Sequence, residues 1–313
     1  MPEARPALLG RIWRVVRLLV ALALVAVLAR VAGAGDLLKA GALDYGWLAF
    51  AAALIVPSVW VRAYNHGLLL NSHERLLSSA QLFRLTLIGA GIALVLPLGA
   101  ADLLKARWGL VAHGHAEEMV ISSVFDKLTS LTALAVMGVV GALATGDLVL
   151  AAVSATVMVG TLVPLAVPTR GLWRLLLRVL APRAELDESI VARQARPAFP
   201  LLLRVWAVSL GAWVLTYVVV YASCRAVGAP VELLTVFAVA PLATISRLIP
   251  VSAGGIGVGE ATLAALLVRS GVAADLAAQV ALVQLVLLVL LPGLAGAVLL
   301  AMAPRPGSVP PRP

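Results

Sequence analysis

Long apolar runs alternate with short polar segments along this chain, and the pattern predicts a bundle of membrane helices. A bilayer core about 30 Å thick needs roughly 20 apolar helical residues to cross it. Strands of a membrane barrel would instead be short and alternate between apolar and polar residues. The apolar runs lie at about 13–34, 43–62, 81–101, 119–144, 148–168, 200–224, 232–250, 256–270 and 276–302.

The charges between these runs predict how the chain is threaded. Segments with an excess of Arg and Lys stay in the cytoplasm. Such an excess marks the N-terminal arm, segments 62–84 and 169–200, and the C-terminal tail. It is missing from segments 30–44, 145–147 and 225–232. We therefore expect a multi-pass protein of the cell membrane with both termini in the cytoplasm.

This threading leaves two regions, 81–116 and 232–275, that begin and end on the same side of the membrane. Each is predicted to be a re-entrant helical hairpin. Within lipid, a broken helix survives only where protein or a wet cavity surrounds the free backbone groups. Proline and glycine supply the breaks, and the predicted turn residues are Pro97 and Gly99 in the first hairpin and Pro250, Gly254, Gly255 and Gly257 in the second.

The predicted fold class is an all-α polytopic membrane protein with about six full spans and two re-entrant hairpins. Residues 1–303 form one transmembrane domain, and the Pro-rich tail 304–313 is expected to be disordered. The halves 13–147 and 148–303 each read as span, span, hairpin, span, and they start on opposite sides. They therefore predict an inverted repeat, in which paired interruptions mark a transport site.

Composition supports a membrane class and narrows the functions. Hydrophobic residues make up 62% of the chain and charged residues 12%, with a mean hydropathy of +1.04. Soluble domains are about a quarter charged. The net charge of +9 lies mostly in loops that flank spans, so we expect no nucleic-acid partner. The longest polar stretch, about 181–200, is too short for a soluble catalytic domain.

Charged residues within or beside the apolar runs are the candidate site. An intramembrane charge costs at least about 2.5 kcal/mol, so it is rarely without a role. Arg247 and Glu260 flank the second turn and either pair with each other or contribute one charge each to a cavity. The alternative for the whole set is that ion pairs only hold helices together. The predicted substrate-binding residues are Asp102, Lys105, Arg107, Asp126, Lys127, Arg247 and Glu260.

Other polar residues are interpreted as peripheral. Arg62, Asn65 and His66 fall in the first inner segment and are expected to be interfacial anchors. His113 and His115 read as solvated loop residues, so no metal site and no cofactor are predicted. The chain has no nucleophile elbow, P-loop, paired zinc motif or lipid-enzyme catalytic cluster, and we expect no enzymatic activity.

At these motifs the chain resembles the flippase-like transmembrane domain of the lysylphosphatidylglycerol synthase family. The resemblance covers nearly the whole chain and rests on the stretches 96–106, 125–128 and 250–260. It implies a role in lipid transfer between leaflets. Lys105 and Lys127 stand where the family usually has Arg, and Gly259 stands where Arg is common. The aminoacyl-transferase domain of the family is absent, so synthesis of lysylphosphatidylglycerol is not expected.

The leading hypothesis is therefore a lipid translocase that moves a phospholipid or a polyprenyl-linked lipid between leaflets. Two alternatives stay open. One is a small-solute or ion carrier with the same inverted fold. The other is a non-transporting membrane subunit of a lipid-modifying system, with an enzyme as its partner. An intramembrane lipid transferase is disfavoured by the missing catalytic cluster.

Overall fold

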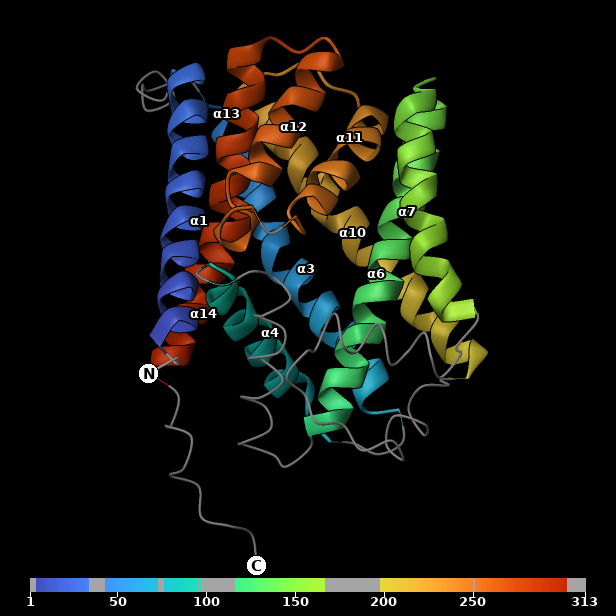
Figure 1. Cartoon of the computed structure of the whole chain (residues 1–313). Helices are drawn as coiled ribbons and strands as arrows, with labels where there is room; N and C mark the ends of the chain where they lie inside the picture. The colour runs from blue at the N-terminus through green and yellow to red at the C-terminus, as the bar shows by residue number, and fades with distance from the viewer. Residues whose placement is uncertain are drawn as a thin grey trace, which may run out of the picture.

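A computed structural model describes residues 4–33, 43–72, 76–94, 96, 116–166, 198–249 and 251–302, and all regular structure within them is helical (Figure 1). The helices are α1 (Ala4–Val31), α3 (Tyr45–Leu70), α4 (Ser79–Ala93), α6 (Ala116–Ala144), α7 (Leu148–Ala166), α10 (Phe199–Val227), α11 (Leu233–Ser246), α12 (Val258–Arg269), α13 (Ala274–Gln284) and α14 (Leu291–Ala301).

Five helical stretches are long and apolar enough to cross a membrane, which confirms the multi-pass class. They are α3, α6, α7, α10 and the continuous stretch from α13 to α14. Helix α1 contains the shorter apolar segment Leu19–Val31. The sixth span and the inverted repeat therefore stay predictions.

Three helices are too short to cross a bilayer. Helices α4, α11 and α12 have 15, 14 and 12 residues, or about 22, 21 and 18 Å at 1.5 Å per residue. Figure 1 shows α4 in the lower half of the molecule and α11 and α12 in the upper half. A glycine-rich turn joins α11 to α12, as the second predicted hairpin requires. The turn of the first hairpin, including Pro97 and Gly99, lies outside the described residues.

Helix α3 extends further than the apolar run predicts, to Leu70 instead of position 62. A side chain caps the first turn of the helix, and the side chain that follows its last residue bonds the next segment of the chain. The Asp44 carboxylate accepts hydrogen bonds from the backbone N–H groups of Gly46 and Trp47. At the other end, Asn71 accepts from the N–H of Leu77 and donates to its carbonyl. Polar residues beyond position 62 are therefore part of the helix.

The last span is interrupted by a π-helical segment, Leu285–Leu290, between α13 and α14. Pro292 follows at the start of α14, and a proline there cannot donate a backbone hydrogen bond. π-Helical turns of this kind occur frequently at functional sites. Here Leu288, Val289 and Pro292 line the cavity described below.

Glycines bring two pairs of helices into close contact. A Cβ atom at Gly91 of α4 would overlap the backbone of Gly296 and Ala297 in α14. A Cβ atom at Gly141 of α6 would overlap the backbone of Phe237 and Ala238 in α11. Close backbone approach through small residues is a common way to pack helices in membranes. Each short helix is thus fixed against one long helix.

Two apolar clusters lie along α6 and α10 with polar positions between them. On α10 one cluster includes Val205 and the other includes Val220, and Ser209 and Thr216 fall between these positions. On α6, the cavity residue Ser130 falls between Leu128 of one cluster and Leu134 of the other, one turn after Asp126. The clusters thus enclose a polar layer.

Candidate functional site

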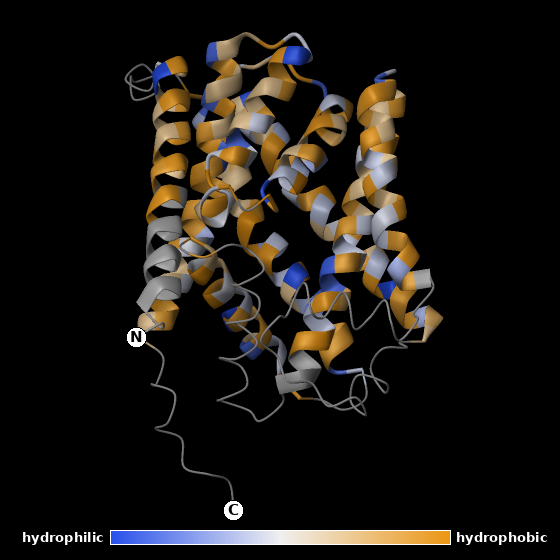
Figure 2. Cartoon of the chain, in the orientation of Figure 1, coloured by the Kyte–Doolittle hydropathy of each residue, from blue (hydrophilic) through white to orange (hydrophobic). Residues whose placement is uncertain are grey.

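A cavity of about 340 Å³ lies between α3, α4, α6, α10, the turn after α11 and the π-helical segment. Figure 2 shows apolar residues over most of the helix surfaces and hydrophilic ones gathered where α3 and α6 pass each other. Ligand-binding pockets in proteins are mostly apolar and contain a few convergent polar groups. Its polar and charged lining residues are Ser58, Arg62, Asn65, His66, Thr86, Asp126, Lys127, Ser130, Ser209, Thr216, Thr244, Arg247 and Gln284.

Helix α3 supplies a polar stripe that the sequence interpretation placed wrongly. Ser58, Arg62, Asn65 and His66 recur at intervals of three and four, so they share one helical face, and all of them line the cavity. Asn65 and His66 are almost fully buried. They are therefore cavity residues, and the expectation that they are interfacial anchors is wrong. The cause is the longer extent of α3.

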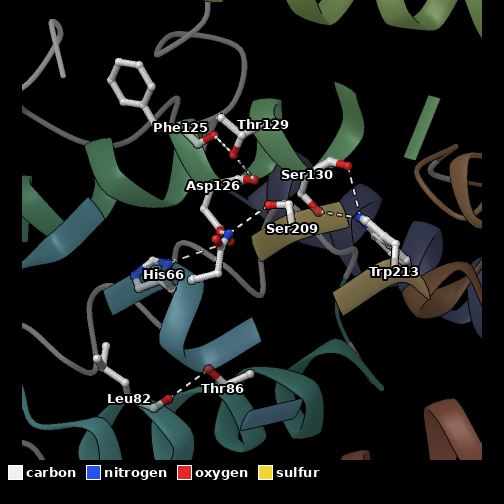
Figure 3. Close-up of polar contacts among 10 residues, drawn as sticks. His66, Leu82, Thr86, Phe125, Asp126, Thr129, Ser130, Ser209 and Trp213 are labelled. Atoms are coloured by element: carbon white, nitrogen blue, oxygen red, sulfur yellow. Dashed lines mark hydrogen bonds and ion pairs between the residues drawn. The ribbon is translucent and has the colours of Figure 1, made fainter. Parts of the chain in front are cut away.

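Asp126 of α6 is held by side chains of α3, one of which also bonds α10 (Figure 3). Its carboxylate accepts a hydrogen bond of 2.8 Å from the Asn65 side-chain amide, which also donates to the Ser209 hydroxyl at 2.9 Å. The Nδ1 atom of His66 lies 3.9 Å from the same carboxylate. Asp126 and Lys127 both line the cavity, so the structure brings these predicted site residues to it.

The Arg62 guanidinium lies against α10. It donates a 2.8 Å hydrogen bond to the Thr216 hydroxyl and lies over the Trp213 ring, 4.3 Å from its centre. Trp213 is fixed across the cavity, because its indole N–H donates to the carbonyl and the hydroxyl of Ser130 at 3.0 Å each (Figure 3). A cation on an indole face is attracted by the negative face of the ring.

Arg247 and Glu260 pair with each other, which settles the two alternatives left open for them. Their side chains are joined by a 2.6 Å hydrogen-bonded ion pair, and Glu260 also accepts from the backbone N–H of Gly257 at 2.7 Å. The Glu260 side chain is completely buried and that of Arg247 is 15% exposed. Arg247 also lines the cavity, so it faces the site while its carboxylate partner lies behind it.

The turn between α11 and α12 is built from glycines that the sequence singled out. Gly254, Gly255 and Gly257 have φ angles of +60°, +74° and +85°, a conformation that other residues rarely adopt. A Cβ atom at Gly255 or Gly259 would overlap Arg247. Gly259 therefore makes room for the Arg247 side chain at the position where the resemblance leads one to expect an arginine.

The other predicted residues cannot be placed in this way. Asp102, Lys105, Arg107 and Pro250 lie outside the described residues, as do the turn residues of the first hairpin. Sequence reasoning missed the cavity positions on α3 and α10. The signal that would have found them is the spacing of polar residues at three and four positions, as in Ser209, Trp213 and Thr216.

Comparison with known proteins agrees with the resemblance seen at the motifs. None of the curated proteins compared with this chain matches it significantly. The family model described as the lysylphosphatidylglycerol synthase TM region matches residues 14–296, which include every described cavity residue. A match of this extent covers both predicted halves and both predicted hairpins. The chain therefore belongs to the lysylphosphatidylglycerol synthase transmembrane-region family.

Proposed function

We propose that this protein is a lipid translocase that passes the headgroup of a phospholipid or polyprenyl-linked lipid through the central cavity. The observation that carries the proposal is the charged cavity itself. Arg62, Asp126, Lys127 and Arg247 line it, within a protein whose outer surface is largely apolar. Intramembrane charges that face a shared cavity mark substrate or ion pathways.

The size of the cavity favours a headgroup. At about 340 Å³ it lies near the lower end of the range for ligand pockets, roughly 300–1,000 Å³. A polar headgroup fits such a space, whereas the acyl chains of the same lipid remain in the surrounding bilayer. A translocase needs this division, since only the headgroup is costly to move through hydrocarbon.

An inverted repeat is part of this proposal, and helix packing supports it. Helix α4 crosses α14 at Gly296, and α11 crosses α6 at Gly141. The first short helix of each predicted half therefore packs on the last span of the other half. Exchange of this kind is expected of two halves related by an axis in the membrane plane.

The decisive experiment is a leaflet-asymmetry assay in proteoliposomes that hold the purified protein. Asp126→Asn removes a cavity charge, and Glu232→Gln removes an exposed charge at the start of α11. The proposal expects lipid transfer above that of empty vesicles, lost in Asp126→Asn and kept in Glu232→Gln. If neither phospholipids nor polyprenyl-linked lipids move faster than in empty vesicles, the proposal fails. Uptake of a water-soluble solute in the same vesicles would instead support the carrier alternative.

A further inference from the structure

Arg62 differs from the other arginine of the cavity in how its charge is balanced. Arg247 is bonded to the buried carboxylate of Glu260. Arg62 forms no ion pair with any described residue, and its contacts are one hydroxyl and one aromatic face. A guanidinium carries five N–H donors. One of them is committed to Thr216, so the others are available to an acceptor in the cavity.

The hydroxyl and the ring that contact Arg62 carry no charge, and the Asp126 carboxylate of the same cavity attracts the guanidinium electrostatically. The Thr216 hydroxyl donates its own proton to the Ala212 carbonyl at 2.8 Å, so it presents a lone pair to the guanidinium. Tyr217 stacks on the Trp213 ring, with 5.6 Å between the ring centres. A planar cation with one face on a ring keeps the N–H groups along its edge free. Such an edge matches two oxygen atoms of a phosphate.

Gln284 is the last residue of α13, directly before the π-helical segment. It lines the same cavity and is 6% exposed. Its buried carboxamide oxygen accepts no hydrogen bond from a described residue. A buried acceptor without a donor is costly, so the group favours a ligand that supplies one.

We propose that Arg62 and Gln284 form a two-point headgroup site. Arg62 binds the phosphodiester oxygens of a lipid headgroup, and Gln284 accepts a hydrogen bond from a hydroxyl or ammonium group beyond the phosphate. The choice of a lipid rests on the proposed function, whereas the anion and donor chemistry rests on these two side chains alone. The ligand class is thus a phospholipid with a polar substituent on its phosphate.

The test measures lipid retention by the purified full-length protein in detergent, using native mass spectrometry. The probes are dioleoyl phosphatidylglycerol, dioleoyl phosphatidic acid, which lacks the substituent, and dioleoylglycerol, which lacks the phosphate. Arg225 offers a matched control, because it also lies over a tryptophan ring but is exposed at the far end of α10. Arg62→Gln should lower phosphatidylglycerol retention about tenfold or more, and Arg225→Gln should leave it within about twofold.

Gln284→Leu separates the second point of the site from the first. Phosphatidylglycerol retention should fall while phosphatidic acid retention stays unchanged, because only the former carries a hydroxyl beyond its phosphate. Dioleoylglycerol should not be retained by any variant. Equal retention of phosphatidylglycerol by Arg62→Gln and Arg225→Gln would overturn the role of Arg62. An equal fall for both phospholipids in Gln284→Leu would overturn that of Gln284.

A measurement on the unaltered protein covers the case in which Arg62→Gln does not fold. Phenylglyoxal modifies arginine side chains, and peptide mass spectrometry locates the product. Phosphatidylglycerol should protect Arg62 at least about fivefold more than dioleoylglycerol does, and it should not protect Arg225. Equal modification of Arg62 with either lipid contradicts the site.

A competition measurement distinguishes a lipid headgroup from a soluble phosphodiester. The competitor is soluble glycerophosphoglycerol, which has the headgroup without acyl chains. Weak competition supports a lipid ligand. Competition as strong as that of the lipid would support the anion chemistry at Arg62 but overturn the lipid source and the translocase together. If lipid binding depends on Arg62 while no transfer occurs in proteoliposomes, the proposed function fails and the site stands.

Discussion

Breaking the buried Arg247–Glu260 pair should destabilise the protein by an amount that depends on how exposed the remaining charged side chain is. Removing one partner of a fully buried ion pair costs about 3–5 kcal/mol, because the other charge stays uncompensated. In Arg247→Ala, Glu260 is left completely buried, so the full range applies. In Glu260→Ala, the 15% exposed Arg247 turns toward the cavity, and the cost falls to about 1–3 kcal/mol. Arg247→Ala should therefore be the more destabilising change.

Thermal unfolding in detergent micelles measures both changes and their combination. At roughly 2–4 °C for each kcal/mol, Arg247→Ala should lower the melting temperature by about 6–20 °C. The double variant Arg247→Ala/Glu260→Ala should melt above Arg247→Ala, since the second substitution removes the uncompensated carboxylate. Additive effects of the two substitutions would refute the reasoning. A larger loss in Glu260→Ala than in Arg247→Ala would refute the argument from exposure.

A second ion pair in the same protein is the matched control. Arg269 bonds to Asp147 at 2.9 Å, but their side chains are 47% and 23% exposed. Exposed pairs contribute about 0.2–1 kcal/mol, so the same cycle on Asp147 and Arg269 should give a coupling below about 1 kcal/mol. Asp147 also accepts from the backbone N–H of Leu150, which is the main reason that its pKa lies below the ordinary value of 3.8, followed by the pairing with Arg269.

Three other predictions concern the loops and crossings. The pKa of Asp147 is lowered on folding, so its contribution to stability is fully present above the ordinary value of 3.8 and is lost as the pH falls through the folded-state pKa. The gap between the melting temperatures of the wild type and Asp147→Asn should therefore be equal at pH 7 and 5 and should narrow as the pH falls below 3.8. Gly296→Ala should lower the melting temperature, because its Cβ would overlap the backbone of α4. The control is Gly160→Ala, where a Cβ meets nothing within 4 Å, and it should keep the melting temperature or raise it by an amount worth about 1 kcal/mol at most. Equal effects would contradict the close crossing of α4 and α14. In intact cells, Thr145→Cys should react with an impermeant thiol reagent and Ser79→Cys should not, and the reverse result would overturn the predicted threading.

The sequence predicted the features of this fold that are local. Apolar run length identified the spanning helices, and the glycines of the second hairpin were expected at Gly254, Gly255 and Gly257, where the backbone has positive φ. Motif residues identified the family before the comparison confirmed it. These features depend on neighbours within a few positions, so a single sequence contains the information they need.

The cavity could be predicted only in part, because it depends on partners far apart in the chain. The apolar run 43–62 ended at Arg62, so it missed the remaining turns of α3. The partner of Arg62 is Thr216, which lies 154 positions away, and no local pattern connects the two. Gln284 is a single polar residue within the apolar run 276–302, and no local pattern indicates that it lines the cavity.

The glycine crossings determine which parts of the molecule are able to move together. Helix α4 precedes position 147 but is fixed to α14 near the end of the chain, and α6 is fixed in the same way to α11. The parts of the chain before and after position 147 are therefore interleaved, and moving one past the other as two separate bodies would break both crossings. Each closely packed pair of helices thus combines segments from either side of this position.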